Sequence, residues 1–307
     1  MKKVLALVLA LVFCLALFAG CSPESKEGDT PASDEPTQQP TQQGGSSASG
    51  TDLEGSSKPS ANIPEGATVI KIGASPAPHT EILEAARDVL LEQNIYLEVV
   101  EFDDYVIPNT ALEEGELDAN YFQHIAYLND FNAERGTHLV NAGGIHYEPL
   151  AIYPGQVATL DELTDGAKIA VPNDSTNEAR ALMLLEAQGL LKLKDGVGLS
   201  ATKMDIAENP HNFDIVEMEA KLLPTALADV AVAIINGNYA LGAGIDSSTA
   251  LAFEDTASAA SDYVNVIAVK EGNENNDAIK ALVEALQSES VKSFMEIRYG
   301  SAVVPAA

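Results

Sequence analysis

The run Val69-Ile70-Lys71-Ile72-Gly73-Ala74 begins a pattern in which strands and helices alternate, and this pattern indicates the fold class. The run itself is typical of a strand. Apolar residues then recur at helical spacing between Thr80 and Asn94, and Tyr96–Phe102 is again typical of a strand. A strand, a helix and a second strand with short connections indicate a βαβ unit, so we expect a largely parallel sheet.

The same alternation restarts in the second half of the chain. Lys168–Pro172 is typical of a strand and Asn173–Gly189 of a helix, and Asp214–Met218 and Val230–Ile235 are further strand-like runs. A last strand-like run, Tyr263–Val269, precedes two helical segments. Two blocks of this kind predict an α/β protein with two lobes, each a mostly parallel sheet flanked by helices, and a cleft between them.

The amino terminus has the form of a secretory signal over residues 1–20: a basic start, an apolar run and small residues. The apolar run is shorter than the roughly 20 residues that a membrane-spanning helix needs. Leu17–Cys21 resembles a bacterial lipobox, although Phe18 departs from its usual aliphatic residue. The resemblance implies cleavage before Cys21 and lipidation of Cys21, and the alternative is ordinary secretion with Cys21 as a free thiol.

Residues 21–66 are rich in Ser, Pro, Gln, Gly, Thr and acidic residues and almost lack large apolar ones. Such a segment cannot bury enough surface to offset the entropy of ordering, so we predict a lipidated, disordered tether. The only other cysteine, Cys14, lies inside the signal, so the mature chain cannot form an internal disulfide. Loss of Lys2 and Lys3 takes the net charge from -29 to -31, which argues against nucleic acid as a partner.

Three constellations could form a ligand site. The first, Asp118-Ala119-Asn120-Tyr121-Phe122-Gln123-His124, holds two aromatic rings, an imidazole and amides where α/β sheets bind their ligands. By itself it is equally compatible with core aromatics and a histidine that caps a helix.

The second constellation lies in Val171–Arg180. Ser175 and Glu178 have the spacing of a capping box, so a helix should begin beside Ser175 at a strand end. Its free N–H groups, with Arg180 one turn later, could receive a carboxylate. The third, Asn236-Gly237-Asn238-Tyr239, brings amides to the end of an apolar strand. The alternatives are an ordinary capped helix with Arg180 in a surface ion pair, and an Asn-Gly turn.

Catalytic and metal signals are weak. The five histidines form no H-x-x-x-H pair, and the sequence lacks both a G-x-S-x-G motif and a phosphate-binding glycine loop. We therefore predict no metal, no cofactor and no enzymatic activity. His124 is the one candidate for acid–base chemistry, and the sequence shows no partner that would orient it.

Together these residues resemble the methionine-binding lipoproteins of bacterial ABC importers. The matching runs are collinear and cover nearly the whole of 69–305. They are Phe102–Leu112, Asp118–His124, Val171–Leu182, Leu193–Leu199, Glu208–Pro210, Ile235–Ala240 and Tyr263–Val266.

The resemblance implies a two-lobed periplasmic-binding-protein fold of type II with a two-strand hinge. The first lobe would comprise 67–150 and 250–307 and the second 151–249, with hinge crossings near Gly144–Tyr153 and Tyr239–Asp246. It implies that Tyr121, Phe122 and His124 line a side-chain pocket, and that Arg180 binds the ligand carboxylate. Further implied ligand residues are Tyr105, Asn109, Tyr147, Asn177, Asn236 and Asn238.

The function so implied is capture of L-methionine or a close relative and its delivery to an ABC-importer permease with its ATPase. The protein would be a monomer on the extracytoplasmic side of the cell membrane, held by its lipid. Alternatives within this class are D-methionine, methionine sulfoxide or a short methionine-containing peptide. Alternatives from other classes are an enzyme on the same fold and a tethered adhesion or signalling lipoprotein.

The lipobox predicts that Cys21→Ser yields a protein without a lipid anchor, because the substitution removes the acylated sulfur. Detergent phase partitioning measures this directly: wild type should enter the detergent phase and the variant the aqueous phase. Wild-type protein in the aqueous phase would show that Cys21 is not lipidated.

Overall fold

The computed structural model describes residues 56–57 and 63–306. The predicted signal at 1–20, the lipidation site Cys21 and most of the predicted tether at 21–66 lie outside the described residues. Ser56–Ser57, inside the predicted tether, forms β1 and pairs with the edge strand β3 (Ile95–Glu101). An edge strand offers unpaired backbone groups, so this pairing needs no apolar side chain. Among the described helices, none is both long and apolar enough to cross a bilayer.

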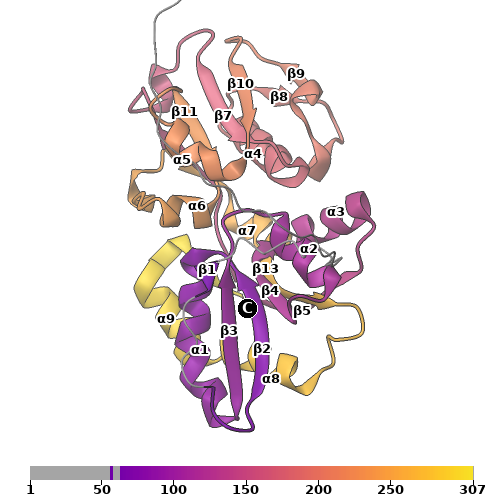
Figure 1. Ribbon diagram of the computed structural model, residues 1–307. Helices are drawn as coiled ribbons and strands as arrows, with labels where there is room; N and C mark the ends of the chain where they lie inside the picture. Colours follow the sequence, from indigo (N-terminus) through magenta and orange to yellow (C-terminus); the bar gives the residue numbers. More distant parts are fainter. Residues whose placement is uncertain (1–55, 58–62, 307) are drawn as a thin grey trace, which may run out of the picture. The chain divides into compact units, whose positions relative to one another are not determined.

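The first sheet has seven strands in the order β1-β3-β2-β4-β13-β5-β14 (Figure 1). The strands β2, β3 and β4 run parallel, as the βαβ pattern predicts. The strand β13 runs antiparallel to both of its neighbours, β4 and β5. The bounds of these strands are β2 Thr68–Ala74, β4 Ala119–His124, β5 Leu139–Tyr147, β13 Val264–Lys270 and β14 Val304–Pro305.

Helices cover both faces of this sheet, because alternate strand residues point to opposite sides. Ile70 and Ile72 pack with one set of helices, and Val266 and Ala268 lie in the core on the other side. The first set is α1 (Glu81–Glu92), α8 (Asp277–Leu286) and α9 (Glu289–Tyr299), and the second is α2 (Ile107–Glu114) and α3 (Ile125–Arg135).

The second sheet has five strands in the order β10-β7-β11-β6-β12. Ile169 and Val171 face α4 (Ser175–Ala187), whereas Ala170 packs in the core on the side of α5 (Leu223–Ala226) and α6 (Gly237–Gly242). The strands are β6 Ala151–Pro154, β7 Lys168–Pro172, β10 Asp214–Met218, β11 Val232–Ile235 and β12 Ala252–Phe253, and β8 (Lys192–Leu193) pairs separately with β9 (Ile206–Glu208).

Short helical elements complete the described fold. They are η1 Pro76–Thr80, η2 Leu160–Glu162, η3 Gly198–Ser200, η4 Lys203–Asp205, η5 Ala220–Leu222, η6 Ser247–Thr249, α7 Thr256–Ala259 and η7 Gly300–Ala302.

Both sheets are mixed, so the prediction that each is mostly parallel is wrong outside β2-β3-β4 and β10-β7-β11. The reason is the route of the chain between the sheets. The strand β6 begins just after β5 ends, at the edge where β7 and β11 end, and therefore runs opposite to β11. The strand β13 brings the chain back from the second sheet and likewise runs opposite to β4.

The second crossing between the sheets also differs from the prediction. Tyr239 lies in helix α6, and the strand β12 that follows still pairs with β6 in the second sheet. The chain therefore returns between Phe253 and Val264, later than the predicted Tyr239–Asp246. Backbone pairing of a two-residue strand leaves little trace in side-chain pattern, so the sequence did not reveal β12.

Candidate functional site

A cavity with an empty volume of about 330 Å³ lies between the carboxyl ends of strands from both sheets. The lining from the first sheet and its loops is Tyr105, Phe122, Gln123, His124, Tyr127 and Asn265, and Glu148 comes from the first crossing. The lining from the second sheet is Asn177, Arg180, Asn236, Gly237 and Asn238.

Three aromatic rings form the apolar wall of the cavity. The ring of Tyr105 lies 5.8 Å from that of Phe122 and 5.6 Å from that of Tyr127, measured between centroids. The Tyr105 hydroxyl donates to Asn238 Oδ1 over 2.6 Å, and the Tyr127 hydroxyl donates to the Tyr105 carbonyl over 3.1 Å. Both hydroxyls are therefore satisfied within the protein, which leaves ring surface for an apolar ligand group.

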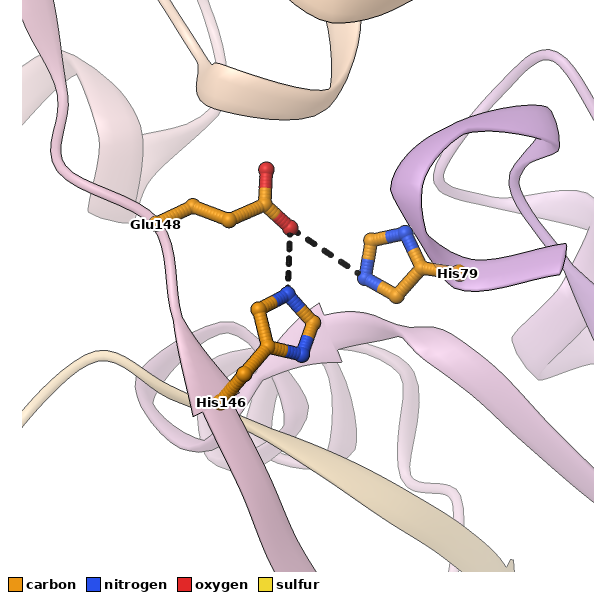
Figure 2. Close-up of side chains that lie close together, drawn as sticks. All are labelled: His79, His146 and Glu148. Atoms are coloured by element: carbon orange, nitrogen blue, oxygen red, sulfur yellow. Dashed lines mark hydrogen bonds and ion pairs between the residues drawn. The ribbon is translucent and has the colours of Figure 1, made fainter. Parts of the chain in front are cut away.

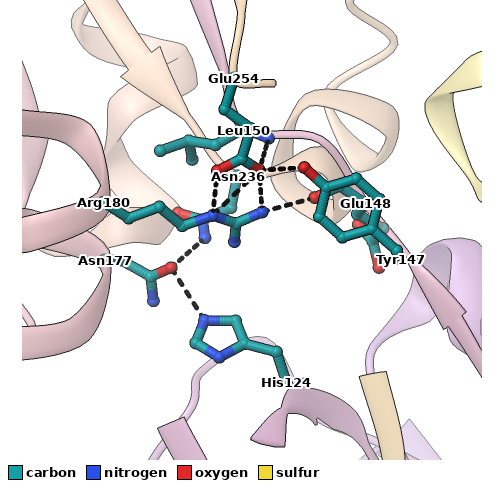
Figure 3. Close-up of polar contacts among 8 residues, drawn as sticks. All are labelled: His124, Tyr147, Glu148, Leu150, Asn177, Arg180, Asn236 and Glu254. Carbon is teal, nitrogen blue, oxygen red and sulfur yellow. Dashed lines mark hydrogen bonds and ion pairs between the residues drawn. The ribbon is translucent and has the colours of Figure 1, made fainter. Parts of the chain in front are cut away.

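A chain of hydrogen bonds fixes the imidazole and the amides opposite (Figure 3). His124 Nδ1 accepts from the Tyr127 backbone over 3.0 Å, so Nε2 carries the proton and donates to Asn177 Oδ1 over 3.1 Å. Asn177 Nδ2 donates to Asp174 over 2.7 Å, and Asn236 Nδ2 donates to Asn177 Oδ1 over 2.8 Å. These bonds set both amide orientations. They leave Asn236 Oδ1 buried without a partner among the described residues.

Burial, together with the charge of Arg180, lowers the pKa of His124 to about 3. The imidazole is therefore neutral at physiological pH. Its two nitrogen atoms already bond to protein groups, so it is a fixed part of the cavity wall.

Arg180 is 4 % exposed and forms an ion pair with Glu254. Its Nε donates to both carboxylate oxygen atoms over 2.8 and 3.0 Å, and Nη2 donates to Glu254 and, over 2.7 Å, to the Glu148 carbonyl (Figure 3). The Tyr263 ring lies 4.2 Å from the guanidinium carbon. Among the hydrogen bonds of the described residues none uses Nη1. Arg180 can therefore offer a ligand one nitrogen and its charge, and the paired N–H edge that suits a carboxylate is already taken.

The start of helix α4 differs from the predicted capping box. Asp174 caps the helix and accepts from the Asn177 backbone over 3.0 Å. The Ser175 hydroxyl instead donates to Asp130, and Glu178 accepts from the Lys203 backbone over 2.7 Å. Because the cap is itself a carboxylate, the helix dipole already has its anion, and this terminus does not favour a second one.

Seven of the ten predicted ligand residues line the cavity, and three do not. Tyr121 does not line it, because its side chain packs in the core with α1 and α8 and its hydroxyl bonds to His146 Nδ1. Asn109 is buried behind the wall, where it donates to Gln123 over 2.8 Å. The Tyr147 hydroxyl donates to Glu254 over 2.6 Å. The residues in the cavity are Tyr105, Phe122, His124, Asn177, Arg180, Asn236 and Asn238.

Five lining residues were not among the predicted ligand residues, although two of them lie inside the quoted constellations: Gln123, Tyr127, Glu148, Gly237 and Asn265. Tyr127 could have been found, since it lies one helical turn after His124. Glu148 and Asn265 carry no local motif and reach the cavity only through the two crossings.

A cluster of two histidines and one carboxylate lies beside the cavity (Figure 2). His146 Nε2 lies 2.8 Å from Glu148 Oε1, and His79 Nε2 lies 3.4 Å from the same atom. These potential ligand atoms lie within 4.8 Å of one another, which a metal ion could use. Hydrogen bonding to the carboxylate accounts for the arrangement without an ion.

Comparison with known proteins identifies the family. The family model described as NlpA lipoprotein matches residues 70–307. The chain belongs to the NlpA lipoprotein family.

Relatives in this family and solved structures are similar to this NlpA-family chain over most of their length. D-methionine-binding lipoprotein MetQ of Salmonella typhimurium is 44% identical over 225 residues, which is 72% of this chain and 82% of that protein. A solved nutrient-binding protein from Burkholderia cenocepacia, bound to methionine, is 42% identical with a TM-score of 0.74, and the match covers 78% of this chain and 100% of that one.

A periplasmic substrate-binding protein of an ABC transporter from Coxiella burnetii is 41% identical with a TM-score of 0.73, covering 77% of this chain and 100% of that one. The two helix-covered sheets are thus the two-lobed periplasmic-binding-protein fold, as the resemblance predicted.

Acid should destabilise this protein through its buried histidines. Burial lowers the pKa of His79 to about 4 and those of His124 and His146 to about 3, against about 6.5 in an unfolded chain. Between these values the unfolded chain binds protons that the folded chain does not, so the free energy of unfolding falls as pH falls from 7 toward 4. Burial raises the pKa of Glu148, which offsets part of this loss.

Urea unfolding at a series of pH values between 7 and 5 measures this dependence. His138→Asn, at an exposed histidine, is the matched control and should leave the slope of the free energy of unfolding against pH unchanged. A free energy of unfolding that stays constant over this range would contradict the prediction.

Arg180→Ala should lower the free energy of unfolding by about 3–5 kcal/mol, because it leaves the largely buried side chain of Glu254, 9 % exposed, without its cation. Arg180 as a ligand group alone would instead predict an effect on binding and little on folding. Arg298→Ala is the control, since Arg298 pairs with Glu81 at an exposed site and such pairs contribute little. Equal midpoints of urea unfolding for the two variants would show that the Arg180 pair does not stabilise the fold.

Proposed function

We propose that this protein captures free methionine in the cavity and delivers it to the membrane permease of an ABC importer. The observation that carries the proposal is the pairing of an aromatic wall from one sheet with a buried arginine from the other. Tyr105, Phe122 and Tyr127 suit a thioether, because polarisable sulfur gains about 0.3–1.5 kcal/mol per aromatic contact. Arg180 supplies positive charge for a carboxylate through its remaining Nη1.

Closure of the two lobes would follow from ligand contacts with both. Tyr105 bonds across the cleft to Asn238, and the Tyr239 hydroxyl donates to the Asp103 carbonyl over 3.0 Å. A ligand that touches both sides favours this closed form by its difference in affinity for the two states. The names of the relatives, a D-methionine-binding lipoprotein and a protein bound to methionine, support the same ligand class.

The finer organisation belongs to the proposal as well. We infer a first lobe at 67–150 with 250–307 and a second lobe at 151–249. The strand β12 is the exception, because it pairs with β6 and is therefore assigned to the second lobe. The protein would be a monomer anchored through Cys21 on the extracytoplasmic side of the membrane, and its partners would be the permease and its ATPase.

Binding without catalysis agrees with the state of His124. A general base needs a pKa near the working pH and a free nitrogen atom. Burial lowers the pKa of His124 to about 3, and both of its nitrogen atoms are engaged. D-Methionine is the second candidate ligand, since the Salmonella relative carries it in its name.

Calorimetric titration of ligand-stripped protein tests the proposal. L-Methionine, D-methionine, methionine sulfoxide, glycyl-methionine and leucine are compared at one pH and salt concentration. We expect one enantiomer of methionine to bind at least about tenfold, or roughly 1.4 kcal/mol, more tightly than leucine, since aliphatic groups lack the sulfur–aromatic contacts. Equal binding of leucine, or no binding of any of the five, would refute the proposal.

A further inference from the structure

We propose that Glu148, held by His79 and His146, is the receptor for the free α-ammonium group of the ligand and makes that group a requirement for binding. The inference rests on the proposed function, in that the cavity holds an amino acid. It adds a specificity-determining residue that the sequence did not indicate.

Glu148 lies in the crossing between β5 and β6 and is 6 % exposed, with its side chain in the cavity lining. His146 Nε2 donates to its Oε1 over 2.8 Å (Figure 2). The Tyr121 hydroxyl bonds to His146 Nδ1. His79 Nε2 lies 3.4 Å from the same oxygen and 3.0 Å from Asn265 Oδ1. Glu148 is thus clamped from one side by side chains of the first sheet.

The other carboxylate oxygen lies against Gly237, at the start of α6. A Cβ placed on Gly237 would come within 2.7 Å of Glu148 Oε2, so only glycine allows this approach. Gly237 directly follows Asn236, whose Oδ1 is buried and unpartnered among the described residues. Glu148 and Asn236 both line the cavity, and Glu148 Oε2 lies beside the residue that directly follows Asn236.

Among the described residues, Glu148 forms ion pairs only with His79 and His146. Burial keeps both histidines neutral by lowering their pKa values to about 4 and about 3, so they donate hydrogen bonds but no charge. Arg180, whose charge also acts on Glu148, is already paired with Glu254. Burial raises the pKa of Glu148, and a cationic ligand group beside it would favour the ionised carboxylate.

An α-ammonium group supplies both missing elements. Its positive charge compensates Glu148, and its N–H groups can bond to Glu148 and to Asn236 Oδ1. With Arg180 at the carboxylate, the lining then matches a zwitterion with one anion and one cation of its own.

A ligand-based double-mutant cycle tests this inference. Wild type and Glu148→Gln are titrated with methionine and with its 2-hydroxy analogue, in which a hydroxyl replaces the ammonium at nearly the same size. Wild type should bind methionine on the order of 30-fold or more tightly than the analogue, as for a buried charge pair. In Glu148→Gln the ratio should fall close to one, mainly through weaker methionine binding.

Controls separate a local from a general effect. Glu219→Gln removes an exposed carboxylate that lines a neighbouring pocket and should leave the ratio unchanged. His146→Asn acts through Glu148 and should lower the ratio while the analogue still binds, which a merely structural role would not produce. Thermal melting shows whether each variant is folded.

The outcomes are distinct. A large ratio retained in Glu148→Gln overturns the role of Glu148 and leaves methionine capture standing. Equal binding of both ligands by wild type overturns the ammonium requirement even if the Gln variant does not fold. No binding of methionine by wild type refutes the proposed function, and the inference falls with it.

Discussion

The buried ion pair between Arg180 and Glu254 is the interaction on which the rest of the site depends. It joins helix α4 of the second sheet to the segment that returns the chain to the first sheet. Glu254 also accepts from the Tyr147 hydroxyl and from the Leu150 backbone over 2.7 Å, both next to the first crossing. One carboxylate thus ties together both crossings and the arginine of the cavity. Charges removed from water persist only when such additional hydrogen bonds satisfy them.

The two sheets contribute different kinds of side chain to the cavity. The first sheet contributes rings from Tyr105, Phe122 and Tyr127, and the second contributes Arg180 and the amides. An elongated ligand with an apolar end and a polar end would therefore have to touch both lobes. That requirement connects recognition to closure, since either half of the lining alone offers only part of the ligand's contacts.

Local structure could be predicted from the sequence because it depends on periodicity. Lys168–Pro172 and Asp214–Met218 form with the predicted bounds. The geometry of the site was harder to predict from the sequence. The alternation of strand residues could have separated Tyr121 from Phe122, but the partner of Arg180 lies 74 residues away, and no local pattern reveals it. The competition of Asp174 with Ser175 for the helix cap was equally hidden, because both residue types cap helices well.

We propose that the cavity shared by the two sheets holds a zwitterionic amino acid between Arg180 and the aromatic wall. A crystal structure of the protein grown with L-methionine is the most direct test. We expect the thioether among the rings of Tyr105, Phe122 and Tyr127, the carboxylate at Arg180 Nη1, and the ion pair with Glu254 intact. Methionine bound outside this cavity, or inserted with its thioether toward Arg180, would refute this mode of binding.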